Sequence, residues 1–78
     1  MYLEKTDPAK NQNRYYSLCV AKTLFGDYAL MRQWGRIGNR GGRRLSVWYD
    51  TEKEAQQALE TLQKRKQKRG YVIPLRKV

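Results

Sequence analysis

The segment from Thr51 to Gly70 limits the fold most, because it has helical periodicity and its apolar side must be covered. Small and apolar residues recur there at spacings of three and four, which gives one apolar stripe: Ala55, Ala58, Leu59 and Leu62. Thr51, with Glu54 three residues later, fits a capping box at a helix start, and Gly70 is a typical C-terminal stop. The pattern predicts a helix over residues 51–69 whose stripe must pack on a sheet.

The residues before this helix have β-forming patterns. Residues 14–25 are rich in Tyr, Val, Leu and Thr and predict a strand, and residues 28–37 predict its hairpin partner. Gly26-Asp27 between them suits a two-residue turn of type II′. The glycine-rich residues 38–42 predict a loop, followed by a third long strand over residues 43–50.

Weaker β signals lie at the two ends of the sequence. Residues 2–6 predict a short strand, and a polar connection follows it. Any strand after Gly70 belongs at a sheet edge, because Pro74 has no N–H to donate to a ladder. The fold class predicted is therefore α+β: an antiparallel sheet of four to five strands with one helix packed on it.

Charge is the strongest compositional feature. The 78 residues include 17 Lys and Arg against 7 Asp and Glu, a formal net charge of +10, while 40% of the residues are hydrophobic. We therefore expect one small folded domain spanning residues 1–78. A polyanionic partner is the first one that such a charge suggests.

Several kinds of chemistry are not expected. The sequence has no histidine and one cysteine, Cys19, which leaves no basis for an internal disulfide, a zinc site with several Cys or His ligands, or a Ser-His or Cys-His mechanism. The carboxylates show no paired spacing, so we expect neither an enzyme nor a cofactor. Cys19 lies between apolar residues of a predicted strand and is expected to pack as a small hydrophobe.

Location and oligomeric state are also only expectations. No segment resembles a signal peptide or a membrane span, so we expect an intracellular protein without membrane contact. The sequence contains no dimer-forming heptads, and we expect a monomer.

The stretch QWGRIGNRGGRR, residues 33–44, contains the candidate binding residues. In a strand, alternation places Arg32, Trp34 and Arg36 on one face and Gly35 on the other. The indole can stack on a flat surface, the arginines can bind phosphate in a bidentate manner, and Gly35 permits a close backbone approach. Alternatively, Trp34 belongs to the core or covers a sheet edge, and the arginines are solvated.

Further cations extend this surface. The glycine loop and the strand after it add Arg40, Arg43 and Arg44. The end of the helix carries a basic run in which Lys64 and Lys68 lie one turn apart, away from the apolar stripe, and can follow a phosphate backbone. The alternative is that this run only complements the helix dipole. The remaining aromatics near the helix, Trp48 and Tyr71, are expected in the core.

Trp34-Gly35-Arg36, followed by Ile37-Gly38, resembles the tripeptide motif of the WGR domain, which is found in DNA-damage-dependent poly(ADP-ribose) polymerases. The similarity extends along the chain through RYYSLCV, YALMRQWGRIG, Trp48, the helix and Tyr71, in the family's order. It implies a compact antiparallel sheet with one helix that binds DNA strand breaks near the terminal nucleotides. Carried over, Trp34 would stack on an end nucleotide, Gly35 would give room, and Arg36 would hold phosphate.

The resemblance does not extend to catalysis, because the chain has no counterpart of the polymerases' catalytic, zinc-finger or helical regulatory domains. It suggests a standalone module, as in some bacterial proteins, with a role in DNA repair and a cytoplasmic, nucleoid-associated location if it binds DNA. Two other hypotheses stay open: a protein interaction module that docks an acidic partner, and an RNA or single-strand binder, because stacking on Trp34 needs no particular sugar.

Overall fold

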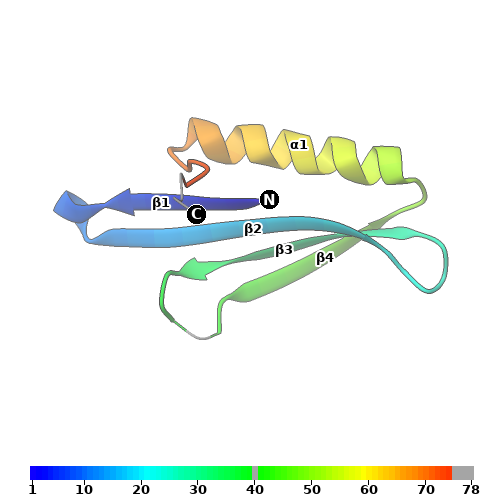
Figure 1. The fold of residues 1–78 in the computed structure, drawn as a ribbon, viewed down its shortest axis with the longest axis horizontal. Helices are drawn as coiled ribbons and strands as arrows, with labels where there is room; N and C mark the ends of the chain where they lie inside the picture. The colour runs from blue at the N-terminus through cyan, green and yellow to red at the C-terminus, as the bar shows by residue number, and fades with distance from the viewer. Residues whose placement is uncertain (40, 75–78) are drawn as a thin grey trace.

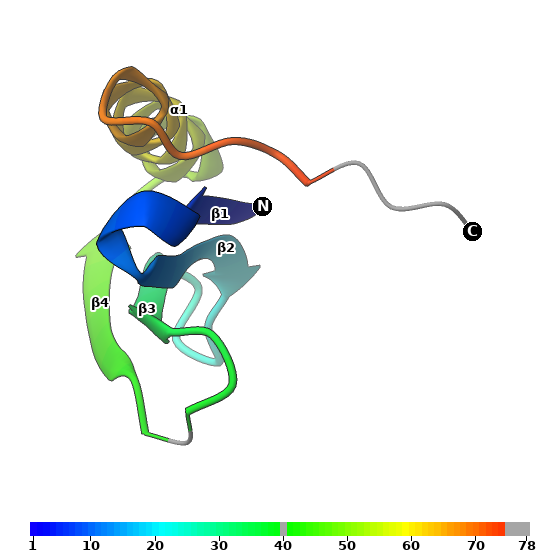
Figure 2. The ribbon, with the colours of Figure 1, turned by 90° about the vertical axis from the view of Figure 1, so that its left-hand side faces the viewer.

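The computed structural model describes residues 1–39 and 41–74. Four strands form one antiparallel sheet in the order β1-β2-β3-β4, and the helix α1 covers one face of it (Figures 1 and 2). The elements are β1 (Tyr2–Asp7), a 3-10 turn η1 (Pro8–Lys10), β2 (Gln12–Lys22), β3 (Tyr28–Arg36), β4 (Arg43–Tyr49) and α1 (Glu52–Lys68). The predicted α+β architecture is confirmed.

The segment after the helix returns to the sheet. Val72 forms an isolated antiparallel bridge with Glu4, on the outer side of β1. The Glu4 amide donates to the Val72 carbonyl over 2.9 Å, and the Val72 amide donates to the Glu4 carbonyl over 2.8 Å. As expected from Pro74, this pairing lies at the edge of the sheet.

Both predicted ends of the helix are confirmed. Thr51 has extended backbone angles, and its Oγ1 accepts a hydrogen bond from the Glu54 amide over 3.2 Å, which satisfies one of the free N–H groups of the first turn. At the other end, Gly70 has a φ of +100°, which favours glycine. The Tyr71 amide donates to the Lys66 carbonyl over 3.1 Å and closes the helix.

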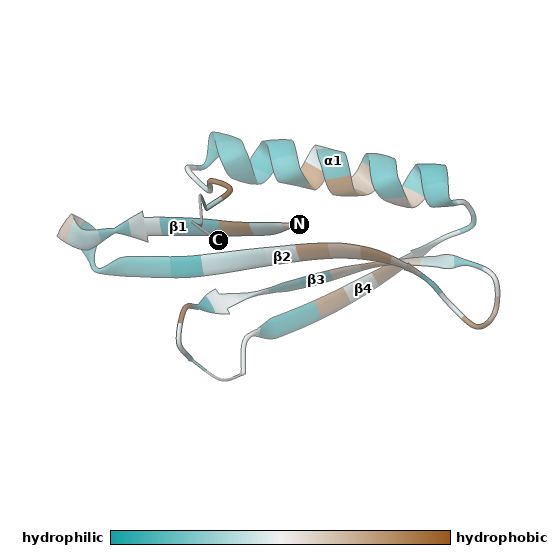
Figure 3. Cartoon of the chain, in the orientation of Figure 1, coloured by the Kyte–Doolittle hydropathy of each residue, from teal (hydrophilic) through white to brown (hydrophobic). Residues whose placement is uncertain are grey.

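The core lies between α1 and the sheet. It is built from Leu3, Tyr16, Leu18, Leu30 and Leu59, with Tyr71 packed against it as expected. Figure 3 shows apolar residues where β1 and β2 approach the helix, whereas the outer side of the helix is hydrophilic. Burying each of the leucines contributes on the order of 2 kcal/mol relative to exposure.

The predicted two-residue hairpin turn is wrong. A five-residue loop, residues 23–27, joins β2 and β3. The Thr23 amide donates to the Asp27 carbonyl over 2.9 Å, and the Thr23 hydroxyl donates to the Asp27 carboxylate, so these two residues close the loop instead of Phe25 and Tyr28. Leu24 and Phe25, expected in a strand, are consequently fully exposed at its tip.

Two side chains expected in the interior lie on the other face of the sheet. Tyr49 packs against the core, so its neighbour Trp48 points away from α1 and is 59% exposed. Cys19 lies between Leu18 and Val20, which both face the core, and its thiol is therefore exposed. We call this side, which α1 does not cover, the open face.

Candidate nucleic-acid interface

Trp34 is part of a cluster of aromatic rings at the end of β3. It lies directly opposite Tyr16 of β2, and the two rings stack with centroids 5.5 Å apart and planes 10° apart. Tyr71 meets the Tyr16 ring edge-on, with centroids 6.2 Å apart. The Trp34 side chain is half-buried, so part of its indole remains accessible. Both readings of Trp34, core packing and an available ring, therefore apply in part.

Two cations lie over these rings. Arg32 places its guanidinium carbon 5.5 Å from the Trp34 ring centroid, and its Nε donates to the Tyr16 hydroxyl over 2.9 Å. From the helix side, the Lys66 ammonium lies 4.5 Å from the Tyr16 centroid. Such cation–π contacts stabilise by about 0.5–2 kcal/mol. Arg32 thus holds the rings in position, in addition to bringing charge.

Lys66 is surrounded by positive charge. Its burial lowers the pKa of the ammonium from the usual 10.5, and the positive charges of Arg69, Arg32 and Arg65 lower it further. An anion bound near these groups would offset this repulsion.

A hollow of about 480 Å³ opens beside the aromatic cluster. Arg14 and Arg36 are directly opposite each other on β2 and β3, and both are exposed. The lining combines cations, amides and aromatic rings: Lys10, Asn11, Gln12, Asn13, Arg14, Trp34, Gly35, Arg36 and Tyr71. These groups suit an anion that carries a flat ring system.

A second hollow, of about 210 Å³, shares Trp34, Gly35 and Arg36 and continues to Arg43. The close approach expected at Gly35 is present, and it involves the same chain. A Cβ at Gly35 would lie 3.1 Å from the Gly42 Cα. At Gly42, a Cβ would lie 2.5 Å from the Trp34 carbonyl oxygen and against the Tyr15 hydroxyl. These glycines bring the loop onto the end of β3.

We call this region the motif end. It contains the end of β3, the β1–β2 connection and the end of α1, which lie together at the left of Figure 1. No ion pair neutralises Lys10, Arg14, Arg36 or Arg43 within residues 1–39 and 41–74. The motif end therefore presents uncompensated positive charge beside an aromatic cluster.

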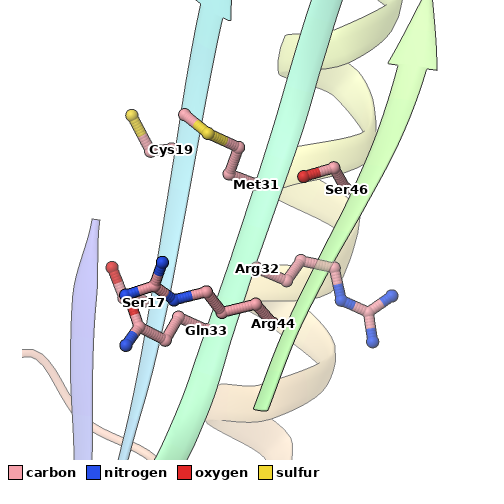
Figure 4. Close-up of a pocket in the computed structure, with 7 residues that line it drawn as sticks. All are labelled: Ser17, Cys19, Met31, Arg32, Gln33, Arg44 and Ser46. Carbon is pink, nitrogen blue, oxygen red and sulfur yellow. The ribbon is translucent and has the colours of Figure 1, made fainter. Parts of the chain in front are cut away.

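The other candidate residues that the structure describes do not line the two hollows beside Trp34. Lys64 and Lys68 are on the exposed side of α1, where with Thr61 and Arg65 they line a separate hollow of about 290 Å³. Arg44 is on the open face and lines a hollow of about 390 Å³ with Ser17, Cys19, Met31, Arg32, Gln33 and Ser46 (Figure 4). Arg40 lies outside the described residues. The structure thus brings Arg32, Trp34, Gly35, Arg36 and Arg43 together, but not Lys64, Lys68 and Arg44.

Several residues of the motif end were not found from the sequence. The sequence marks Lys10, Asn11 and Asn13 only as part of a polar connection, and it gives Arg14 a place in a strand without a role. The β2–β3 register could have revealed Arg14, because it lies opposite Arg36. The expected two-residue turn would instead have placed Ser17 there.

In the described part of the chain, no group of three or more Cys, Asp or Glu side chains could hold a metal ion. Among the same residues, no helix is long and apolar enough to cross a membrane.

The fold and the motif end define a small basic α+β module with an aromatic and cationic surface. A family model described as "WGR domain" matches residues 1–77, and the chain belongs to this family. WGR domains are non-catalytic modules of a nucleic-acid-binding type, found in proteins related to poly(ADP-ribose) polymerases.

One curated relative is similar over most of the chain. It is the "Uncharacterized protein y4dW" of Sinorhizobium fredii, 39% identical over 71 residues. The matched part is 91% of this chain and 34% of that protein, so the chain spans about one third of the relative's length.

Proposed function

We propose that the motif end binds DNA and prefers ends or strand breaks. The observation that carries this proposal is the hollow beside Trp34, where two aromatic rings and three cations surround one space, and these cations have no carboxylate partner among residues 1–39 and 41–74. Membership of the WGR family supports the nucleic-acid class of ligand. The proposed role is binding without catalysis and without a cofactor.

The preference for ends follows from stacking. Inside a duplex, each base is covered by its neighbours, whereas a terminal nucleotide offers a free surface to an indole. Stacking of a base on an aromatic side chain contributes about 1–3 kcal/mol. The cations of the motif end bind phosphate anywhere along the backbone and raise affinity for all DNA. Trp34 therefore supplies the discrimination and the cations supply the general affinity.

The residues have different proposed parts. Trp34 stacks on a terminal base, Gly35 lines the hollow and lets the Gly42 loop approach the end of β3, and Arg36 binds phosphate. Arg32 holds the Trp34 indole in position through its cation–π contact. Lys10 and Arg14, which line the same hollow, add phosphate contacts. The remaining candidate cations would contact the backbone of the bound DNA further away: Arg40, Arg43, Arg44, Lys64 and Lys68. In a bacterial cell this function would place the protein at the nucleoid, with a role in DNA repair.

The test compares a DNA duplex with an open, 5′-phosphorylated end and the same sequence closed as a dumbbell. The double variant Trp34→Ala, Arg36→Ala is titrated against wild type, with circular dichroism to establish that it folds. A matched control, Trp48→Ala with Lys22→Ala, removes one exposed indole and one cation outside the motif end. We expect wild type and control to prefer the open end, and the motif variant to lose about tenfold or more in affinity for it.

Salt dependence tests the phosphate contacts separately. If about four phosphates are neutralised, the logarithm of the affinity falls with the logarithm of salt with a slope near −3.6. Equal binding to both DNAs, unchanged in the motif variant, would contradict the proposal and favour an acidic protein partner. Tighter binding to a matched RNA would favour the RNA hypothesis.

A further inference from the structure

The two edges of the sheet differ in what lies beside them. The outer side of β1 pairs with Val72 through two backbone hydrogen bonds. β4 is the last strand at the other side, and within the described residues no strand lies beyond it. The N–H and C=O groups along the outer side of an edge strand can pair with another chain.

β4 is protected against such pairing at one end only. Natural edge strands commonly carry charge or proline along their length. Here Arg43 and Arg44 start the strand, and the next five residues, Leu45–Tyr49, have neither. Leu45 is 45% exposed and Trp48 is 59% exposed. This uncharged part of the edge therefore leaves apolar surface in contact with water.

The side chains of β4 are complementary to those of a second β4 strand that runs antiparallel to it. An antiparallel pairing of two β4 strands centred on Ser46 places Leu45 of one copy opposite Val47 of the other. It also places Arg44 opposite Trp48, and Arg43 opposite Tyr49. Directly opposite side chains are about 5 Å apart at Cβ, so the cationic start of each strand lies beside the aromatic end of the other. A parallel pairing would instead place the arginines side by side.

We propose that β4 pairs with β4 of a second copy of this chain, antiparallel about Ser46, in a symmetric dimer. The two four-stranded sheets then form one continuous sheet, and the exposed Leu45 and Trp48 gain partners. The interface is isologous, so it closes after two copies. This inference does not rest on the proposed DNA binding, because the strand pairing involves neither Trp34 nor Arg36. The proposed dimer replaces the monomer that we expected from the sequence. That expectation came from the absence of heptads, which concerns coiled coils and not the pairing of edge strands.

Charge gives the dimer a distinctive salt dependence. Each copy has a net charge of +10, so the copies repel each other at low ionic strength. Screening removes this repulsion as salt rises from about 0.05 M to about 0.5 M. Dimerisation therefore strengthens with salt, whereas DNA binding weakens with salt. Seven paired residues per copy make less than the roughly 1,600 Å² interface of a stable complex, so the dimer forms reversibly at high protein concentration.

Sedimentation equilibrium up to about 1 mM protein at both salt concentrations tests the proposal. We expect a monomer–dimer equilibrium that strengthens with salt, and at least tenfold weaker association for Leu45→Lys with Trp48→Lys. The matched control, Leu24→Lys with Phe25→Lys, removes two more exposed apolar side chains at the hairpin tip and should keep the wild-type equilibrium. A monomer at all concentrations, or equal weakening by both pairs, would overturn the proposal.

The register has its own test, which does not depend on the lysine variants folding. In a Cys19→Ser background, Ser46→Cys places two thiols next to the two-fold axis, while Leu24→Cys places a fully exposed thiol outside β4, in the β2–β3 loop. Oxidation in high salt should cross-link the position-46 variant at least tenfold faster than the position-24 variant. Equal rates would show that the copies do not meet at Ser46.

Discussion

The two ends of the sheet carry opposite charge. At the motif end, cations from β2 and β3 line the hollow beside Trp34, and Lys66 of α1 lies over the Tyr16 ring. The other end, which we call the hairpin end, consists of the loop 23–27 and the helix start 50–54, at the right of Figure 1. Its acidic residues are Asp27, Asp50, Glu52 and Glu54.

The helix dipole explains only part of the difference in charge between the two ends of the sheet. Acidic groups in the first turn of α1 and basic groups in its last turn both complement the helix dipole, each by about 0.3–1 kcal/mol. The dipole does not explain Lys10, Arg14 and Arg36, which belong to the 3-10 turn and to strands. The motif end thus has more positive charge than the helix needs, and this excess points to an external anion.

Replacing Gly42 should break the motif end most strongly. In Gly42→Ala, the new methyl group would collide with the Trp34 carbonyl oxygen and the Tyr15 hydroxyl, so we expect a loss of about 3 kcal/mol in the free energy of unfolding. Urea denaturation measures it. In the control, Gly41→Ala, nothing lies within 4 Å of the new Cβ, and its φ of +87° alone should cost about 1 kcal/mol. Equal losses would mean that the loop does not pack on β3.

Two single substitutions in β2, one near each end of the sheet, test whether the two ends differ in DNA binding. Arg14 and Lys22 lie on the same side of β2, one near its start and one at its end, and both are exposed. Arg14→Ala should lower DNA affinity about tenfold and reduce the magnitude of the salt slope by about 0.9, because one phosphate contact is lost. Lys22→Ala should change the affinity by less than about twofold and should leave the salt slope unchanged. Fluorescence anisotropy over a salt series measures both, and similar effects would imply a diffuse basic coat.

Local sequence signals predicted the helix and the strands, but not the β2–β3 register or the face of the sheet on which Trp48 lies. The helix was predicted correctly because Thr51, the apolar stripe and Gly70 are all local. The β2–β3 register was not, because the bonds between Thr23 and Asp27 replace the turn that Gly26-Asp27 suggests. Trp48 was assigned to the wrong face, because Val47, Trp48 and Tyr49 are consecutive apolar residues without alternation.

The residues of the candidate site also divide into those that have a local sequence signal and those that do not. Trp34, Gly35 and Arg36 are adjacent in the sequence and were predicted together. Arg14 joins them only through the strand register, and Lys66 only through the packing of α1 on Tyr16. Neither contact has a local signal.

The hairpin end should matter for stability and not for binding. Thr51→Ala removes the oxygen that accepts from the Glu54 amide, which should cost about 1 kcal/mol. Thermal unfolding measures this loss. Titration with the open-ended duplex should give unchanged affinity under conditions where the variant is fully folded. Thr61→Ala, in the middle of the same helix, should have a smaller effect on stability. A loss of affinity with Thr51→Ala would mean that the two ends do not act independently.

The smallest expected effect concerns the pH dependence of Lys66. Burial and the charges of Arg69, Arg32 and Arg65 lower its pKa in the folded state below 10.5. Between the folded and unfolded pKa values, the unfolded chain binds more protons, so the free energy of unfolding rises as pH rises through this window. The gain should be small, because solvent screens a partly exposed charge. In Lys66→Met, this rise should be absent from melting curves recorded at increasing alkaline pH, whereas in Lys64→Met it should remain. Bound DNA should abolish the rise in wild type, since phosphate near Lys66 would restore its pKa.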